Sequence, residues 1–190
     1  MKTIIISLKI FLFFTIITGI MYPLFVTGIA QTIFHEKANG SMIIENYKII
    51  GSKLIGQQFD SLKYFTSRPS AISYNPLPSG GSNFGLTNSK LKQQVDQRKH
   101  QFISFNHLDS LTDIPSEMLF ASASGLDPHI SQKAALLQVD RIARARNFND
   151  IQKQKLIECV NILTEKPMFL VLGEERVNVL LLNLEVDKIQ

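Results

Sequence analysis

The chain has 190 residues, 45% of them hydrophobic, and a formal net charge of +4. Lys2 and Lys9 are the only charged residues before position 35, so residues 35–190 carry a net charge of only +2. That excess is too small for the concentrated basic face of a nucleic-acid binder, and the single cysteine, Cys159, excludes an intrachain disulfide.

Residues 10–34 contain no charged side chain. A helix needs about 20 apolar residues to cross a bilayer, so we expect residues 1–34 to form a transmembrane anchor. Pro23 lacks a backbone donor and is expected to kink or loosen this helix. A cleaved signal peptide is the alternative, because Gly28-Ile29-Ala30 resembles a cleavage site. The apolar run is, however, longer than the about 7–15 residues usual in such peptides.

The charges beside the apolar run predict its orientation. Lys2 and Lys9 precede the run, and positively charged flanks favour the cytoplasmic side of a membrane. We therefore expect a single-pass protein with its N-terminus in the cytoplasm and residues 35–190 outside. A cleaved signal peptide would leave the same residues outside.

Residues 35–190 are numerous enough for one domain with a hydrophobic core. β-branched residues and turns predict short strands within Tyr47–Phe59. Pro, Gly, Ser and Asn predict a long loop over Ser73–Asn88, and a loop of this length is often functional. Asn88 is a suitable cap for a helix that reaches about Asn106.

The second half of the domain continues with a short strand of small residues, predicted over Met118–Ser124. Ser131 is a suitable cap for a helix through Arg146. A capping box at Asn149 and Gln152 begins the next helix, which Lys166-Pro167 ends. Leu136, Val139, Ile142 and Ala143 are the expected buried stripe of the first helix, and Leu156, Cys159, Val160 and Leu163 that of the second.

The segment Val177–Leu184 is almost entirely apolar and predicts a strand that is buried on both faces. Helices and strands thus alternate loosely along the second part of the chain. The predicted fold class is α+β, with one N-terminal transmembrane helix followed by a single mixed α/β extracytoplasmic domain.

The loop Ser79–Asn83, with the sequence SGGSN, has backbone amides that could cradle a phosphate. A P-loop needs Gly-Lys-Ser/Thr next, however, and Phe84-Gly85-Leu86 follows instead. Two interpretations therefore stay open: a conformationally demanding surface loop, and a loop that docks on another protein.

Ser124, Asp127 and His129 are the residue types of a hydrolase triad, in which a base must reach the nucleophile. Ser124 is not in a G-x-S-x-G elbow, and Asp127 before a proline is more typical of a turn. The four histidines show no metal-ligand spacing, and Cys159 lies on an apolar helical stripe. We expect neither a catalytic residue nor a metal site.

Gln138, Arg141 and Arg144 recur at three-residue steps on one predicted helix. Such a row is either a solvated face or a polar, cationic face that meets an anion or a partner.

After the apolar run the chain carries, in order, RPS at 68–70, SGGSN at 79–83, TN at 87–88, SASGLDPHIS at 122–131, AxxQxxRIAxAR at 135–146 and LGExRVNVLxLNL at 172–184. This series resembles the C subunit family of the Kdp potassium-transporting ATPase. The resemblance covers essentially the whole chain, and its most specific parts are SGLDPHIS and RVNVLLLNL together.

The resemblance implies a subunit of a four-part complex in the bacterial cytoplasmic (inner) membrane. The partners would be a channel-like subunit that carries potassium, a P-type ATPase subunit that hydrolyses ATP, and a very small membrane subunit. The C subunit would not be the ATPase, and this chain lacks the Asp-Lys-Thr-Gly phosphorylation motif. The family implies a catalytic chaperone that raises the ATP affinity of the ATPase subunit, with ATP as a ligand and no firmly bound cofactor.

Two sets of candidate residues follow. The resemblance implies that Gln138, with Arg141, contacts the nucleotide, although the predicted orientation places both outside and ATP inside. The glycine pair of the loop and nearby Arg and aromatic side chains, which are typical interface anchors, predict a partner-binding surface. Its expected members are Arg68, Ser79, Gly80, Gly81, Ser82, Asn83, Thr87, Asn88, Asp127 and His129.

Two other functions are compatible with a tethered external domain. One is a hydrolase that uses Ser124, His129 and Asp127, and the other is a binding protein for a small anion. Hydrolysis of esters or peptides by the chain would favour the first, and recovery of partner subunits from membranes would argue against both.

The length of the uncharged run predicts that the anchor stays on the mature protein. N-terminal sequencing of the protein extracted from membranes should begin at or near Met1. A mature start at Gln31 would contradict this prediction and indicate a cleaved signal peptide.

Overall fold

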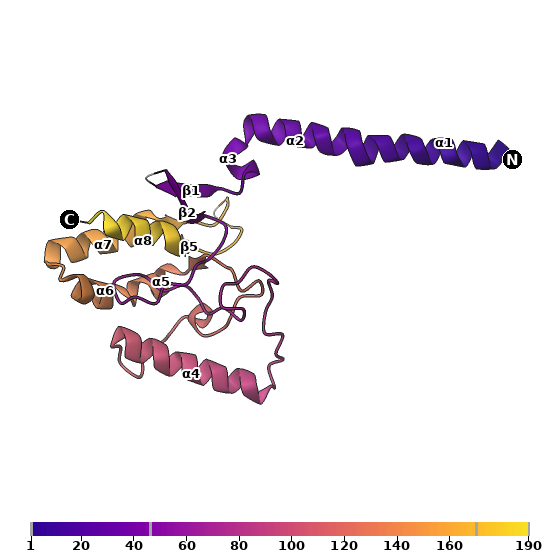
Figure 1. Cartoon of the computed structure of the whole chain (residues 1–190). Coiled ribbons are helices and arrows are strands. Elements are labelled where there is room, and N and C mark those ends of the chain that lie inside the picture. Colours follow the sequence, from indigo (N-terminus) through magenta and orange to yellow (C-terminus); the bar gives the residue numbers. More distant parts are fainter. Residues whose placement is uncertain (1, 46, 170, 190) are drawn as a thin grey trace. The chain divides into compact units, whose positions relative to one another are not determined.

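The computed structural model describes residues 2–45, 47–169 and 171–189. It contains two compact units, Met1–Ile50 and Gly51–Gln190. Figure 1 labels the elements of both units along the chain. The first unit holds the predicted anchor, whereas the second holds the hydrophobic core and all the predicted site residues.

The first unit is mainly one long helix, made of α1 (Lys2–Ile16), a π-helical turn η1 (Ile17–Met21) and α2 (Tyr22–Ile33). Within the described residues it is the single helix long and apolar enough to cross a membrane, and none of its most apolar stretch is buried. These features fit a single-pass membrane protein.

The loosening predicted at Pro23 is confirmed and lies just before the proline. Pro23 occupies the first turn of α2 and has no N–H to offer the carbonyl of Gly19, four residues earlier. The backbone N–H of Tyr22 donates to the carbonyl of Ile17, five residues back, which is the π-helical pattern. The helix therefore widens by one residue here and continues.

A short helix, α3 (His35–Ala38), and a two-stranded sheet of β1 (Met42–Glu45) and β2 (Lys48–Ser52) follow the long helix. Of the strands predicted within Tyr47–Phe59, β2 is the part that forms. The chain from there to residue 88 has turns but no helix or strand among the described residues, as predicted for Ser73–Asn88.

The second unit contains a small antiparallel sheet with the strand order β3 (His129–Ile130), β5 (Arg176–Asn178), β4 (Thr164–Glu165). Ile130 and Thr164 both lie opposite Val177, which is therefore the centre of the sheet. The side chain of Val177 is fully buried.

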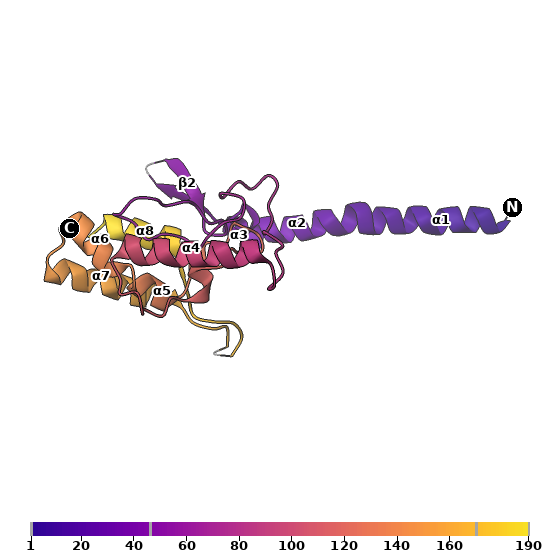
Figure 2. The ribbon, with the colours of Figure 1, turned by 90° about the horizontal axis from the view of Figure 1, so that it is seen from below.

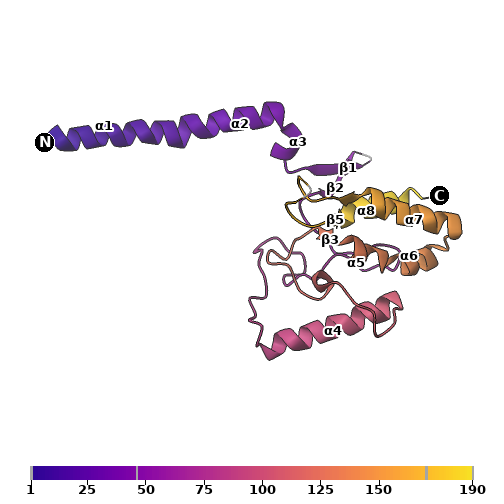
Figure 3. The same cartoon turned by 180° about the vertical axis from the view of Figure 1, so that it is seen from behind.

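The described part of the second unit also contains five α-helices and a 3-10 turn. They are α4 (Ser89–Asn106), η2 (Ser116–Met118), α5 (Gln132–Leu136), α6 (Val139–Arg146), α7 (Asp150–Ile162) and α8 (Val179–Asp187). Of these, α5 and α8 contact β5. Figures 1 and 3 show α5 and α6 between the α7–α8 pair and α4. The core lies between these helices, and its fully buried members include Ile142, Leu156, Val160, Leu182 and Val186.

All three predicted N-caps are confirmed. The side chain of Asn88 accepts a hydrogen bond from Lys90 N at the start of α4, and that of Ser131 accepts one from Ala134 N in α5. Asn149 and Gln152 form the complete capping box of α7. Such caps satisfy amides that the first helical turn leaves without partners.

Three predicted elements are wrong: the strand over Met118–Ser124, the unbroken helix through Arg146 and the strand over Val177–Leu184. Met118–Ser124 is not a strand, because Met118 ends η2 and the chain then runs irregularly. The predicted helix through Arg146 is interrupted at residues 137–138, between α5 and α6. Within the predicted stripes, Leu136 is exposed and Cys159 and Leu163 are only half-buried.

The strand predicted over Val177–Leu184 is the third error. It ends at Asn178, whose side chain accepts from Leu181 N and caps α8. Periodicity cannot separate a strand from a helix when every side of the segment is buried. The polar Asn178 is the feature that starts a helix at this point.

Candidate partner-binding site

The backbone of segment 61–66 is irregular and is bound by side chains of α6 and α8. The guanidinium of Arg141 donates to the carbonyl oxygens of Ser61 at 3.4 Å, Leu62 at 2.5 Å and Tyr64 at 2.9 Å. Arg146 Nε donates to the carbonyl between them, that of Lys63, at 2.8 Å. Four consecutive carbonyl groups are therefore satisfied by two arginines of one helix.

The next two residues of the segment are held by amide side chains. Asn183 of α8 accepts from Phe65 N at 2.7 Å and donates to Phe65 O at 3.0 Å. Gln138 Oε1 accepts from Thr66 N at 2.8 Å and from its hydroxyl at 3.0 Å. Segment 61–66 thus obtains from side chains the hydrogen bonds that a strand would obtain from a neighbouring strand.

Arg141 is the centre of this arrangement. Besides the three carbonyls, its guanidinium donates to Asn106 Oδ1 and Gln138 Oε1, both at 2.9 Å, and lies 4.5 Å from the centre of the Phe105 ring. In the described chain no carboxylate pairs with it. Burial lowers the pKa of Arg141 to about 10, so the side chain stays a cation at neutral pH.

The prediction that Gln138 and Arg141 belong to a polar face, solvated or partner-facing, is wrong. Gln138 is fully buried and Arg141 is 2% exposed, while Arg144, three residues further on, is exposed. Segment 61–66 covers Gln138 and Arg141 and forms hydrogen bonds with their side chains. A nucleotide contact by Gln138 stays a prediction, and it would require Thr66 to give up its hydrogen bonds to that side chain.

Segment 61–66 leads directly into the first predicted site residue. Arg68 NH1 lies 2.6 Å from Asp127 Oδ2. The other carboxylate oxygen of Asp127 accepts from His129 N at 3.0 Å and lies 3.3 Å from His129 Nδ1. The structure therefore brings Arg68 to Asp127 and His129, although Arg68 precedes Asp127 by 59 positions in the sequence.

The carboxyl group of Asp127 is kept ionised by its neighbours. Burial acts to raise its pKa, but hydrogen bonds from the side chain and backbone of His129 and from Arg68 outweigh burial and lower the pKa to about 2. Asp127 is therefore negatively charged throughout the neutral range, and its charge fixes Arg68 and His129 in place.

Two glycines let neighbouring segments approach this cluster. A Cβ on Gly56 would lie 2.6 Å from the carbonyl oxygen of Asp127, and Gly56 N donates to Leu126 O at 2.7 Å. Gly125 has a φ of +71°, and a Cβ there would lie 2.5 Å from the Ile72 side chain. Side chains at these positions would push apart the segments that carry Arg68 and Asp127.

The SGGSN loop rests on the segment that precedes Asp127. Gly80 N donates to Ser124 O at 3.1 Å, and a Cβ on Gly81 would lie 3.1 Å from Ala123 O. The outer side chains of Ser79, Asn83 and Thr87 are exposed, whereas Gly80, Gly81 and Ser82 are half-buried. Asn88 caps α4 instead of joining this cluster through its side chain.

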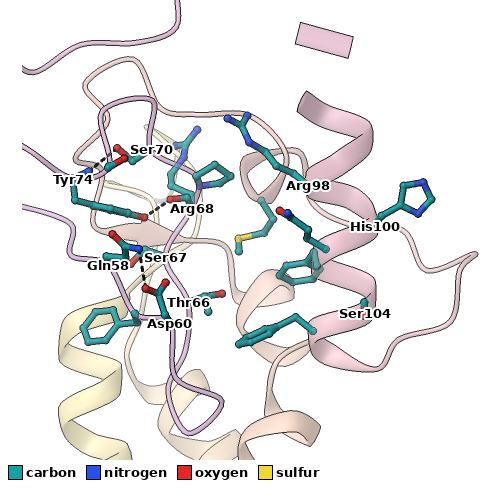
Figure 4. A pocket seen from close by; sticks show the side chains of 17 residues that line it. Gln58, Asp60, Thr66, Ser67, Arg68, Ser70, Tyr74, Arg98, His100 and Ser104 are labelled. Atoms are coloured by element: carbon teal, nitrogen blue, oxygen red, sulfur yellow. Dashed lines mark hydrogen bonds between the residues drawn. The ribbon is translucent and has the colours of Figure 1, made fainter. Parts of the chain in front are cut away.

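An open pocket of about 870 Å³ lies beside the cluster, between the 58–74 segment and α4 (Figure 4). Figure 4 shows Arg68 and Arg98 towards one end of the pocket and Asp60 towards the other. The hydroxyl of Tyr74 donates to the carbonyl of Arg68, and burial raises the pKa of Tyr74 to about 12. The apolar part of the pocket lining is formed by Phe59, Pro69, Phe102, Phe105 and Met118.

A second pocket, of about 580 Å³, is also lined by Arg68. Its charged lining comprises Arg68, Glu117, Asp127, His129, Glu174, Glu175 and Arg176. Arg68 therefore belongs to both pockets, and its salt bridge to Asp127 holds it in place.

The residues of the hydrolase alternative are engaged elsewhere. Ser124 Oγ accepts from Leu126 N at 3.1 Å, and among the described residues no hydrogen bond joins Ser124 to His129. Asp127 could orient His129, but the nucleophile–base contact that such chemistry needs does not form here. Within the same described residues no cluster of His, Cys, Asp or Glu could hold a metal ion.

The sequence pattern did not indicate several residues that build the site. Asn183 and Arg146 bind segment 61–66, and Arg98 lines the larger pocket. Only Asn183 gave a usable signal, because it is a polar residue within the apolar run 177–184.

Comparison with known families gives an independent result. The family model KdpC, described as "K+-transporting ATPase, c chain", matches residues 4–188. The match includes both compact units.

Individual relatives agree over nearly their whole length. The chain is 43% identical over 182 residues to a potassium-transporting ATPase KdpC subunit of Leptospira interrogans, covering 96% of this chain and 92% of the relative. It is 45% identical to that of Pectobacterium atrosepticum, covering 96% and 94%. It is 44% identical to that of Mycobacterium bovis, covering 96% of each chain.

The network of Arg141 predicts a large effect on stability. Arg141→Met should lower the free energy of unfolding by about 2–4 kcal/mol, because several buried acceptors lose their donor at once. Arg144→Met, on the exposed side of the same helix, should change it by less than about 0.5 kcal/mol. Chemical unfolding of the full chain in detergent, followed by circular dichroism, measures both. Equal losses in the two variants would contradict the central role of Arg141.

Proposed function

Because this chain belongs to the KdpC family, the c chain of the K+-transporting ATPase, we propose that it is a non-hydrolysing accessory subunit of an ATP-driven potassium uptake complex. The single observation that carries the proposal beyond the family is the cluster of Arg68, Asp127 and His129. Asp127 is committed to its two neighbours, so the cluster supports a shaped surface more than a reaction.

This surface has the properties of an interface. Its charged groups are fixed by a salt bridge of 2.6 Å, the SGGSN loop is seated beside them, and Arg68 lines two pockets. A preorganised surface loses little conformational entropy when a partner binds. The fixed shape supports recognition of one partner in one orientation.

The proposed partners are the other subunits that the family implies: a channel-like potassium subunit, a P-type ATPase subunit and a small membrane subunit. The subunit would assemble or stabilise the complex and raise the ATP affinity of the ATPase subunit as a catalytic chaperone. Since Gln138 and Arg141 are occupied within the domain, we propose that this effect comes from binding the complex rather than from direct contact with ATP.

We further propose that the second unit lies outside the cytoplasmic membrane, because Lys2 and Lys9 precede the span. In a chain carrying Cys159→Ser, a cysteine at Asn83 should react with an impermeant thiol reagent on intact spheroplasts. A cysteine at Thr3 should react only after the membrane is opened. The reverse pattern would place the domain inside and make a nucleotide contact accessible.

The loop offers a clean test of the interface. A Cβ on Gly80 meets nothing within 4 Å, so Gly80→Val should leave the domain folded while adding bulk to the partner-facing surface. Gly85→Val is the matched control, since Gly85 also has open space around it. We expect Gly80→Val to reduce recovery of the other subunits and potassium-stimulated ATP hydrolysis by about tenfold, and Gly85→Val to leave both unchanged.

Circular dichroism of both variants controls for folding. Full assembly and activity of the Gly80→Val chain would show that the loop is an idle surface. Loss of activity in Ser124→Ala with normal assembly would instead revive the hydrolase interpretation.

A further inference from the structure

The hairpin 166–175, which connects β4 to β5, carries the most conspicuous apolar surface of the second unit. Its side chains Met168, Phe169, Val171 and Leu172 are 66%, 83%, 80% and 61% exposed. No charged residue occurs between Lys166 and Glu174. Large apolar side chains that are exposed together usually mark an interaction site.

The described backbone of this hairpin is ordered by its own hydrogen bonds. Met168 and Leu172 exchange two backbone hydrogen bonds, each of 2.9 Å. Its base is fixed by the pairing of β4 with β5 and by the ion pair of Arg176 with Glu165, at 3.0 Å. Figure 2 shows the two described arms of this hairpin running out from the helices of the second unit. The apolar side chains are therefore presented in advance of binding.

The charges beside the tip restrict what can cover it. Glu174 and Glu175 are exposed and, in the part of the chain that the structure describes, form no ion pair. Two copies meeting through this tip would bring like charges together, which is unfavourable. An anionic lipid surface would also repel both carboxylates. An apolar pocket bordered by Lys or Arg on another protein complements the tip in both respects.

The size and position of the tip indicate how it is used. The four apolar side chains described at the tip are far fewer than the about 20–30 residues that each partner contributes to a stable interface. Glu174, Glu175 and Arg176 also line the second pocket together with Arg68, Asp127 and His129. The hairpin is therefore continuous with the surface described above and adds to it an apolar anchor of the kind that dominates binding energy.

We propose that hairpin 166–175 is a docking knob that enters an apolar, basic-rimmed pocket on another subunit of the K+-transporting ATPase. The inference rests on the proposed function, since it needs a complex to which the chain binds. Phe169 is the anchor of the knob, and Glu174 and Glu175 meet the basic rim.

Recovery of the other Kdp subunits with the tagged full chain, from detergent-solubilised membranes, tests the proposal. Phe169→Asp should reduce this recovery by about tenfold or more. Leu111→Asp is the matched control, because Leu111 is 91% exposed on another loop of the same unit, and recovery should not change. Charge reversal by Glu174→Lys with Glu175→Lys should also lower recovery, and the loss should shrink at high salt.

Unchanged recovery with Phe169→Asp, or an equal loss with Leu111→Asp, would overturn the proposal. The two failures remain distinguishable from failure of the proposed function. If the unmodified chain recovers no other subunit, the accessory role itself is wrong, whereas normal recovery with every variant removes only the knob.

A second measurement separates a protein pocket from the bilayer. The chain contains no tryptophan, so Phe169→Trp introduces a single tryptophan at the tip, whose emission is read on selective excitation of tryptophan over tyrosine. In the full chain alone, placed in phosphatidylcholine vesicles with brominated acyl chains, we expect solvent-exposed emission without quenching, as for Leu111→Trp. A blue-shifted emission that the brominated lipid quenches would show that the tip enters the membrane, and would overturn the proposal.

Discussion

The second unit depends on how the backbone of segment 61–66 satisfies its polar groups without a strand partner. Two arginines of α6 donate hydrogen bonds to four consecutive carbonyl oxygens. The amide side chains of Gln138, the N-cap of α6, and of Asn183 in α8 bind the backbone of the two residues that follow. A buried cation without a carboxylate partner is costly unless every donor finds an acceptor. The hydrogen bonds that the Arg141 guanidinium needs therefore fix the path of this segment. Arg68, two residues after the segment, is placed beside Asp127 as a result.

The site is formed around the contact between Arg68 and Asp127. Asp127 holds Arg68 and His129, while close backbone approaches at Gly56 and Gly125 bring the neighbouring segments within contact. The result is a charged cluster that borders two pockets, with the SGGSN loop beside it and the 166–175 hairpin continuing the surface. The helices thus fix the positions of the site residues, and the exposed loops carry the surface that is proposed to bind partners.

The features that the sequence could predict were local ones. The caps at Asn88, Ser131 and Asn149 and the widened turn before Pro23 depend on residues within a few positions of each other. What could not be predicted depends on distant contacts. Gln138 and Arg141 have the spacing of a surface row, but a segment more than 70 residues earlier covers them. Likewise, the apolar run after Val177 fits a buried strand and a buried helix equally well. Asn183 stands out in this run as a polar residue, but its partner Phe65 lies 118 positions earlier and cannot be identified from the sequence.

The way in which Arg141 and Arg146 bind segment 61–66 has a consequence for how the sequence can vary. Both arginines contact main-chain carbonyls, which every amino acid possesses, and the side chains of Ser61, Leu62 and Lys63 are exposed. At positions 61–63 the two arginines thus select a backbone conformation and not a side chain, whereas Arg146 also lies 4.9 Å from the centre of the Tyr64 ring. Positions 61–63 should accept many substitutions, provided that the turn is preserved, while the arginines that clasp them tolerate few. A stretch that varies freely along the chain can in this way be among the most firmly held in space.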